Sequence, residues 1–281
     1  MELFLRKIVT SDTQLLCMGN LPPLFIRDGK LTVFVQNYYL VNKAALEGFS
    51  IFIRNRIRFE RWWLKFTASK VKRFIVQTET MAVLLKKSLC READVFPFVD
   101  LTIVDSTELI CNHSETKFDF LYVASGEPHK NHAQLILAWV ALAKLNHFPR
   151  LCLTIDKQLF PDLCEWIETR VGKYHLKVEL ISGLPPKEIQ LLYKKTRALI
   201  YPSKFESFGL PLLEAVNVGM PVLASDSSYV YDVINPSMVF DPDSSESIAA
   251  SVIAFTYQRA SFSGIFYNSQ EFLSDVFELD N

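Results

Sequence analysis

Glycine and cysteine are sparse in this sequence. Nine of its 281 residues are glycine and five are cysteine. The cysteines are scattered, odd in number and form no C-x-x-C pair, so we predict reduced thiols rather than a disulfide framework or a zinc site. The five histidines do not cluster with them, and we expect that no metal ion or other cofactor is required.

Long apolar runs are missing as well. The longest, residues 135–143, falls far short of the ~20 residues that a membrane-spanning helix needs. Arg6 and Lys7 interrupt the apolar residues near the N-terminus, so no signal peptide is predicted there. The net charge of −1 gives no reason to expect a nucleic-acid partner. These absences predict a cytoplasmic protein.

Short β-rich runs alternate with helix-length amphipathic segments along the chain. This alternation predicts an α/β fold with parallel sheets and helices on both faces. Strands are expected at residues 14–18, 31–36, 73–77, 94–98, 118–124, 150–155, 177–181, 198–201 and 221–225. Helices are expected at residues 131–145, 161–173, 186–195 and 211–218.

A polar stretch just before residue 118 suggests a domain boundary. The charge balance changes sign there, because residues 1–116 carry 16 Lys and Arg against 12 Asp and Glu, whereas residues 117–281 carry 14 against 19. We therefore predict an N-terminal domain over residues 1–116 and a second domain over 117–260, with 261–281 crossing back to the first. Ligands of such sheets bind at the carboxyl ends of the strands.

The strongest functional signal lies between Tyr201 and Asp226. A strand ends there at Pro202, a loop runs to Gly209, and a helix follows, in whose first turn Pro211 is favoured because its missing N–H costs nothing. Gly219 suits the end of that helix. The loop thus presents backbone N–H groups at a helix N-terminus, a geometry that binds phosphate.

Two glutamates flank this predicted phosphate site. Glu206 lies in the loop, and Glu214 is expected in the first turn of the helix. A carboxylate accepts two hydrogen bonds at once, which suits the hydroxyls of a sugar or a ribose. A nucleotide sugar carries such hydroxyls on either side of a diphosphate, so we predict a nucleotide sugar as the ligand.

The segment F-E-S-F-G-L-P-L-L-E-A resembles the E-x7-E segment of retaining GT-B glycosyltransferases of family four, also called glycosyl transferases group 1. This resemblance implies two Rossmann-like domains. It implies a catalytic role for Glu206 beside the donor sugar and phosphate, and ribose binding by Glu214. The diphosphate would contact the loop formed by Ser207, Phe208, Gly209 and Leu210.

The stretch V-A-S-G-E-P-H-K-N-H resembles a second part of the family pattern. Its Lys130 matches a lysine that faces the donor diphosphate, which implies a second catalytic residue. Many members carry an arginine where this chain has Ser125, and His129 is expected to compensate only in part. Asn131 is expected to cap the helix that follows.

A third segment, residues 180–188, resembles the loop that borders the nucleotide base in the family, which would place Gly183 in the donor site. An ordinary turn rich in glycine and proline between a strand and a helix explains this segment equally well. The segment therefore serves only as supporting context.

The first domain matches the family less well. Members usually run well beyond 281 residues and open with a Gly-rich loop that is not found here, so we expect an incomplete N-terminal domain. The strand at 31–36 resembles one that usually ends in a histidine near the sugar, and here Gln36 and Asn37 stand on the acceptor side instead. Asn37 can hydrogen-bond a sugar but cannot act as a titrating base.

The stretch from Arg54 to Arg73 holds eight basic residues and one acidic residue, together with several aromatic ones. A helix with basic and aromatic faces suits an anionic membrane surface or a lipid-diphosphate acceptor. A domain helix that buries its Trp and Leu residues and solvates its Arg residues is the alternative.

The resemblance implies a hexosyltransferase that moves a sugar with retention from a UDP- or GDP-linked donor. The acceptor is expected to be a lipid-linked saccharide in bacterial surface polysaccharide synthesis (O-antigen or capsule), at the inner face of the cytoplasmic membrane. Three alternatives stay open: a truncated inactive homologue that still binds nucleotide, a GT-B-fold sugar-nucleotide epimerase, and a membrane-associated scaffold.

Overall fold

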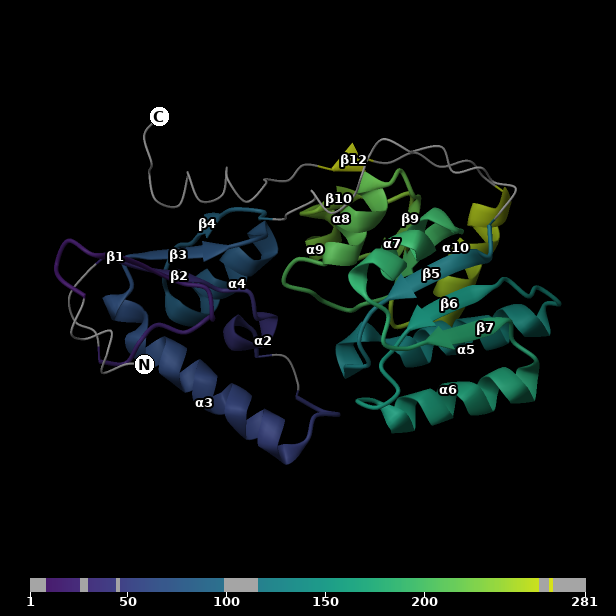
Figure 1. Ribbon diagram of the computed structural model, residues 1–281, viewed down its shortest axis with the longest axis horizontal. Coiled ribbons are helices and arrows are strands. Elements are labelled where there is room, and N and C mark those ends of the chain that lie inside the picture. The colour runs from purple at the N-terminus through teal and green to yellow at the C-terminus, as the bar shows by residue number, and fades with distance from the viewer. Residues whose placement is uncertain (1–8, 26–29, 44–45, 99–115, 258–262, 265–281) are drawn as a thin grey trace. The chain divides into compact units, whose positions relative to one another are not determined.

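A computed structural model describes residues 9–25, 30–43, 46–98, 116–257 and 263–264. The chain divides into two compact units (Figure 1), of which the first is built mainly on residues 9–98 and the second mainly on residues 116–257. The predicted boundary at 116–117 adjoins residues 99–115, which lie outside the described residues. The proposed crossing of 261–281 also lies almost wholly outside them. Both domain limits therefore stay predictions.

The first unit contains a four-stranded parallel sheet whose strands are hydrogen-bonded in sequence order. The strands are β1 (Gln14–Cys17), β2 (Lys30–Phe34), β3 (Arg73–Val76) and β4 (Asp94–Val95). The helices are α2 (Tyr38–Val41), α3 (Ile51–Thr67) and α4 (Glu79–Leu89), with a 3-10 turn, η1 (Ala68–Lys70), after α3. Apolar residues of β2 and β3 form the core with the inner faces of α3 and α4.

Polar caps define where the helices of this unit begin. The Thr78 hydroxyl accepts a hydrogen bond from the Met81 N–H at the start of α4, and the Ser50 hydroxyl accepts one from the Ile53 N–H at the start of α3. Such caps satisfy N–H groups that have no partner within the helix. The basic and aromatic stretch from Arg54 to Arg73 lies mostly in α3, which ends at Thr67, and Arg73 opens β3 where a strand was predicted.

The second unit contains a six-stranded sheet in the order β11-β9-β8-β5-β6-β7, and every neighbouring pair is parallel. This is the strand order of a Rossmann sheet, in which the first and fourth strands are neighbours and the winding direction reverses between them. The strands are β5 (Phe118–Val123), β6 (Leu151–Thr154), β7 (Val178–Ile181), β8 (Thr196–Tyr201), β9 (Val222–Ser225) and β11 (Met238–Phe240).

Helices cover both faces of this sheet, with α5 and α6 on the lower side and α7 and α8 on the upper side in Figure 1. The longer ones are α5 (His132–Lys144), α6 (Pro161–Tyr174), α7 (Pro186–Lys194), α8 (Leu210–Asn217) and α10 (Ser245–Tyr257). The central strands β5 and β8 are almost fully buried because they have helices on both faces. Trp139 of α5 anchors this core and donates its indole N–H to the Pro149 carbonyl over 2.9 Å.

All nine strands predicted along the chain exist, as do the four helices predicted in the second domain, and their ends coincide with the predicted ones or differ by up to three residues. The strand expected at 94–98 is the main exception, since only Asp94–Val95 pairs with β3. Short elements were not predicted: α2, α9 (Ser228–Tyr231), β10 (Ile234–Asn235), β11 and β12 (Ser263–Gly264). Such short elements carry too few residues to show a periodicity of their own.

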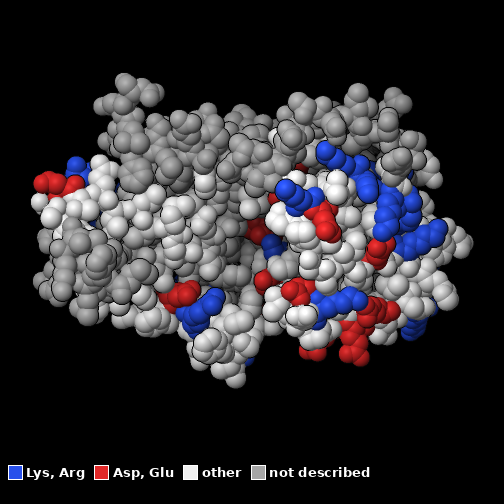
Figure 2. All heavy atoms as spheres, viewed as in Figure 1, with Lys and Arg blue, Asp and Glu red and all other residues white. Residues whose placement is uncertain are grey.

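Charged side chains of both signs are interspersed over the second unit in the view of Figure 2. Several of them are paired, including Lys117 with Glu179 at 3.0 Å and Lys157 with Glu168 at 2.5 Å. These pairs are largely exposed, so each contributes little to stability. In the part of the chain that the structure describes, no helix has the length and apolar character needed to cross a membrane.

Candidate functional site

The topological switch point of the second unit lies between β5 and β8. These strands are hydrogen-bonded neighbours, with Phe120 beside Ala198 and Leu121 beside Leu199, and the chain leaves them toward opposite sides of the sheet. In open α/β sheets, ligands bind outside the carboxyl ends of the strands at this point. The two loops that leave here, residues 124–131 and 202–209, contain most of the residues predicted for the donor site.

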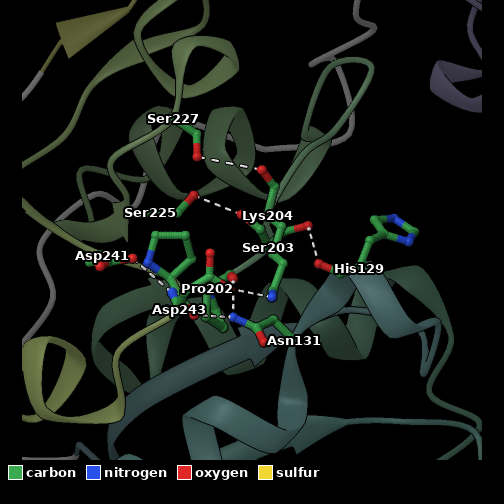
Figure 3. A network of polar contacts seen from close by, with 10 residues as sticks. His129, Asn131, Pro202, Ser203, Lys204, Ser225, Ser227, Asp241 and Asp243 are labelled. Carbon is green, nitrogen blue, oxygen red and sulfur yellow. Dashed lines mark hydrogen bonds and ion pairs between the residues drawn. The ribbon is translucent and has the colours of Figure 1, made fainter. Parts of the chain in front are cut away.

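Asn131 connects these two loops (Figure 3). Its backbone is left-handed (φ 62°), and its side-chain amide donates to the carbonyl oxygens of Pro202 at 3.1 Å and Pro242 at 2.6 Å. It stands at the N-cap position of α5, but its side chain makes no capping hydrogen bond. The prediction that Asn131 caps this helix is therefore wrong: the left-handed backbone directs the amide across the sheet edge instead.

Ser203 is the buried centre of the β8 loop. Its carbonyl accepts hydrogen bonds from the hydroxyls of Ser225 at 2.7 Å and Tyr229 at 2.9 Å, both of which follow or end β9. Its own hydroxyl lies 3.3 Å from the His129 carbonyl in the β5 loop. The β8 loop is thus held from both neighbouring strands, which fixes its backbone before any ligand arrives.

His129 is the second link between the loops. Its carbonyl accepts the Lys204 N–H at 2.9 Å, and its ring stacks on Phe205 with a centroid distance of 4.9 Å and an interplanar angle of 8°. The Lys204 ammonium in turn pairs with Asp243. Basic and aromatic groups from both loops are therefore gathered at the switch point.

Helix α8 begins and ends as its glycines predict. Gly209 has φ +86° and a Cβ there would lie 3.0 Å from Leu212 Cδ1, so the position favours glycine. At the other end Gly219 has φ +72°, and the Gly219→Val216 and Met220→Ala215 hydrogen bonds form a Schellman motif.

The start of α8 presents few backbone donors, and they can be assigned. Pro211 has no N–H, and the Leu212 N–H bonds to the Gly209 carbonyl at 2.9 Å. The N–H groups of Gly209 and Leu210 are therefore those that this helix start offers to an anion. A diphosphate placed here would also meet the positive end of the helix dipole.

Glu214 lies in the second turn of α8. The expectation of a first-turn position is wrong, because the helix starts at Leu210 and Glu214 is its fifth residue. Its Oε2 accepts the Tyr193 hydroxyl proton at 2.8 Å. Burial raises the pKa of the Glu214 carboxyl, and the hydrogen bond from Tyr193 opposes this rise.

The remaining residues of the α8 loop differ in exposure. Glu206 and Phe208 are buried, Ser207 is half-buried and Leu210 is exposed. All four lie between the end of β8 and the first turn of α8, where the sequence placed them. Their contact with a donor stays a prediction.

In the β5 loop, Lys130 ends the 3-10 turn η4 (Pro128–Lys130) and is half-buried. Its carbonyl accepts the Tyr122 hydroxyl proton at 2.7 Å, which fixes its backbone beside the switch point. Ser125 donates to the Glu127 carboxylate, so a side chain that could have met phosphate faces an acid.

The other predicted site residues belong to other elements than the two loops at the switch point. Gly183 (φ +69°) follows β7, two strands from β5, in a loop tied to the β6 loop through the Ser182 hydroxyl and the Ile155 carbonyl at 2.5 Å. In the first unit, the N–H groups of Gln36 and Asn37 donate to Asn20 Oδ1 at 2.6 and 2.9 Å. The Asn37 side chain caps α2, so its oxygen is already in use.

Sequence interpretation overlooked two features here. Tyr193 lies 21 residues before Glu214, a separation that carries no local signal. Asp241 and Asp243 form a D-x-D pair, a common metal-binding pattern, but Asp243 pairs with Lys204 and its N–H donates to Asp241 Oδ1 at 2.9 Å. Among the described residues, no three His, Cys, Asp or Glu side chains gather in a way that could hold a metal ion.

A Rossmann sheet whose switch point carries a fixed loop and a glycine-started helix defines the second unit as a Rossmann-type ligand-binding domain. Residues 110–261 match the family described as glycosyl transferases group 1, and the chain belongs to that family. The predicted membership of the group 1 glycosyltransferases is thereby confirmed.

The names of two curated relatives identify them as mannosyltransferases. The O-antigen chain mannosyltransferase B of Escherichia coli is 28% identical over 134 residues, covering 47% of this chain and 35% of the relative. The O-antigen chain mannosyltransferase RfbU of Salmonella typhimurium is 24% identical over 193 residues, covering 66% and 52%. The chain thus spans about a third to a half of the length of these relatives.

Solved structures show the same fold. WaaG, a glycosyltransferase involved in lipopolysaccharide biosynthesis, is 19% identical with a TM-score of 0.65, covering 92% of this chain and 72% of WaaG. Anabaena HepE, solved with UDP and glucose, is 15% identical with a TM-score of 0.62, covering 81% and 62%. These structural neighbours confirm the predicted α/β fold of the GT-B type.

Proposed function

We propose that this protein transfers a mannosyl group, with retention, from a nucleoside-diphosphate sugar to a saccharide acceptor in O-antigen synthesis. The observation that carries the proposal is the switch point, where the β5 and β8 loops and the start of α8 meet on a sheet with Rossmann strand order. The names of the curated relatives support the sugar and the pathway, and the UDP complex of HepE supports a nucleotide donor.

The leaving diphosphate is the group that this site is suited to stabilise. Lys130 supplies a positive charge, and the N–H groups of Gly209 and Leu210 supply fixed dipoles at the positive end of α8. Preorganised donors of this kind stabilise developing negative charge without reorganising during the reaction. Ser125 and His129 complete the β5 side of the same site.

Glu214 and Glu206 hold the two sugars of the donor. The half-buried Glu214 carboxylate binds the ribose hydroxyls, and Tyr193 orients it by occupying Oε2. In this proposal the donor sugar is contacted by Glu206, Ser207 and Phe208. These assignments follow the family resemblance, and Gly183 is assigned to the border of the base on the same ground.

The anomeric configuration is retained because the reaction takes place on one face of the donor sugar. The bond from the anomeric carbon to the diphosphate oxygen breaks, and the acceptor oxygen bonds to that carbon from the same side. The acceptor's proton passes to the departing phosphate oxygen, so no protein carboxylate is needed as a nucleophile. Gln36 and Asn37 are assigned to the acceptor side, and the acceptor itself is a lipid-linked saccharide at a membrane surface.

Calorimetric titration with UDP and GDP tests the donor site first. We expect one nucleotide to bind, and binding to be lost in Glu214→Ala but kept in Glu165→Ala, which removes an exposed carboxylate of α6. The base that binds identifies the donor. A folded chain that binds neither nucleotide contradicts the proposal.

Transfer is tested separately, with mannose donors carrying either base. Glu206→Ala should abolish transfer while the titration with nucleotide still shows binding. Unchanged turnover in this variant would remove Glu206 from the mechanism. Nucleotide binding by the unaltered chain without any transfer would favour the inactive-homologue or scaffold alternative, and isomerisation of the sugar without acceptor would favour an epimerase.

A further inference from the structure

Helix α3 of the first unit exposes an unusual number of aromatic side chains. Phe52, Phe59, Trp62 and Phe66 are 78%, 53%, 55% and 61% exposed. Trp62 and Phe66 stack on each other with a centroid distance of 5.4 Å and an angle of 11°, and Phe59 lies 5.8 Å from Trp62. At 100° per residue these positions fall on one side of the helix, so they form one continuous aromatic face.

The opposite side of α3 already holds the helix to its unit. Ile57 and Leu64 are buried there. Trp63 lies at the edge of the aromatic face, with its ring centroid 5.8 Å from that of Phe59, and its indole N–H donates to the Pro22 carbonyl at 2.8 Å. Arg61 donates to the carbonyl oxygens of Tyr39 at 2.6 Å and Asn42 at 2.7 Å. The helix is therefore anchored by its buried side and by Trp63 at the edge, while Phe52, Trp62 and Phe66 stay exposed.

Basic residues border the aromatic face. Arg54, Arg58 and Lys65 lie along one edge of it, and the described residues contain no ion-pair partner for any of them. Arg56 lies on the other edge and pairs with Glu60, the single acid of the helix, at 3.5 Å. With five basic residues and one acid, α3 carries a net charge of +4.

We propose that this face of α3 is a membrane-binding surface that lies in the plane of an anionic bilayer. Aromatic rings favour the interface between headgroups and acyl chains, where they bury their apolar area. The bordering guanidinium and ammonium groups are then placed beside lipid phosphates, and long basic side chains reach the headgroup level easily. At ~1.5 Å per residue the 17-residue helix is about 25 Å long, enough to lie along a membrane surface.

An anionic surface fits this face better than a second copy of the chain. Two such faces would bring like charges together, because both carry Arg54, Arg58 and Lys65, and like-charge contact opposes association. A bilayer containing anionic lipid instead offers opposite charge and apolar depth together. The inference concerns binding only, so it holds whether or not the proposed transfer occurs.

Sedimentation with lipid vesicles tests the proposal. Vesicles of phosphatidylcholine are compared with equimolar phosphatidylcholine and phosphatidylglycerol, at low and high salt. We expect the chain to bind the anionic vesicles and to lose affinity as salt rises. Trp62→Ala combined with Phe66→Ala should weaken that binding by roughly tenfold or more, since two large aromatic side chains no longer bury their apolar area in the bilayer interface.

Arg58→Glu combined with Lys65→Glu should remove the preference for anionic vesicles. Leu159→Ala, which truncates a leucine that is 72% exposed on the second unit, should bind as the unaltered chain does. Nucleotide titration of every variant confirms an intact second unit, and circular dichroism an intact fold. Equal binding to both vesicle types, no binding to either, or a dimer that the aromatic substitutions dissolve would overturn the proposal.

Discussion

The phenol of Tyr193 on α7 donates a hydrogen bond of 2.8 Å to the carboxylate of Glu214 on α8. Burial raises the pKa of both groups, and this hydrogen bond lowers the pKa of Glu214 against the effect of burial. The bond thus favours the ionised form of a half-buried carboxylate against the effect of burial, and it leaves Oε1 as an acceptor for hydroxyls. Tyr193 is a positioning residue for the proposed ribose site.

Tyr193→Phe should therefore weaken nucleotide binding and shift its pH dependence. A hydrogen bond to a charged group contributes about 1.5–3 kcal/mol, so we expect roughly tenfold weaker binding near neutral pH. Without the phenol the pKa of Glu214 rises further, and since the carboxylate form binds, affinity should be lost at a higher pH as the solution is acidified. Calorimetric titration at a series of pH values measures both effects.

Tyr231→Phe is the matched control. Its hydroxyl donates to the Asp226 carboxylate at 2.7 Å, but that pair is exposed. Its removal should leave both the affinity and its pH profile unchanged. If Tyr193→Phe and the unaltered chain gave superimposable profiles, Tyr193 would have no role in positioning Glu214.

Much of the second unit could be predicted from sequence because its signals are local. The strands at β5, β6, β8 and β9 are short apolar runs, and Gly219 and Pro211 mark the limits of α8. The order of the strands could not be predicted, because pairing β5 with β8 joins residues more than 70 positions apart. The switch point that positions the site comes from that order.

The hydrogen-bond partners of individual side chains were even harder to predict from sequence than the strand order. Asparagine is a good N-cap residue, so capping was the reasonable expectation for Asn131, yet its partners lie 71 and 111 residues away. Glu214 was placed one turn too early because helix ends are uncertain by one or two residues from sequence alone. The resemblance to the family identified the candidate site residues, and the structure shows which hydrogen bonds hold them in place.

Asn131→Gly isolates the bridge between the two loops. Glycine keeps the left-handed backbone but removes the amide, leaving the carbonyls of Pro202 and Pro242 without these donors. We expect the free energy of unfolding to fall by about 1–3 kcal/mol and nucleotide binding to weaken, because the β8 loop loses its hydrogen bond from Asn131.

Asn146→Gly is the control, since Asn146 is also left-handed (φ 57°) but exposed, and it should change stability little. Equal effects in chemical denaturation would show that backbone conformation alone accounts for the change.

Gly209→Ala tests the start of α8. A side chain at φ +86° costs about 1–2 kcal/mol, and the loop should relieve that strain by moving the N–H groups that face the diphosphate. We expect lower thermal stability together with weaker nucleotide binding.

Gly172→Ala is the control, because it lies inside α6 with nothing within 4 Å of the new Cβ. It should raise stability by about 0.5–1 kcal/mol and leave binding unchanged. A Gly209→Ala chain that binds nucleotide normally would remove this helix start from the site.

His132, the first residue of α5, should make the protein sensitive to mild acid. Burial lowers its pKa to about 3, with smaller contributions from the charges of Lys130 and His129, and neither ring nitrogen has a hydrogen-bond partner among the described residues. The unfolded chain binds this proton with a pKa of about 6.5, so stability is complete above that pH and is lost as pH falls from there toward 3. By pH 5 the loss should reach about 2 kcal/mol.

His132→Phe, which retains a ring against Tyr122, should flatten this slope in denaturant titrations between pH 7 and 5, whereas His175→Phe at an exposed position should not. An unaltered slope in His132→Phe would assign the acid sensitivity to other groups.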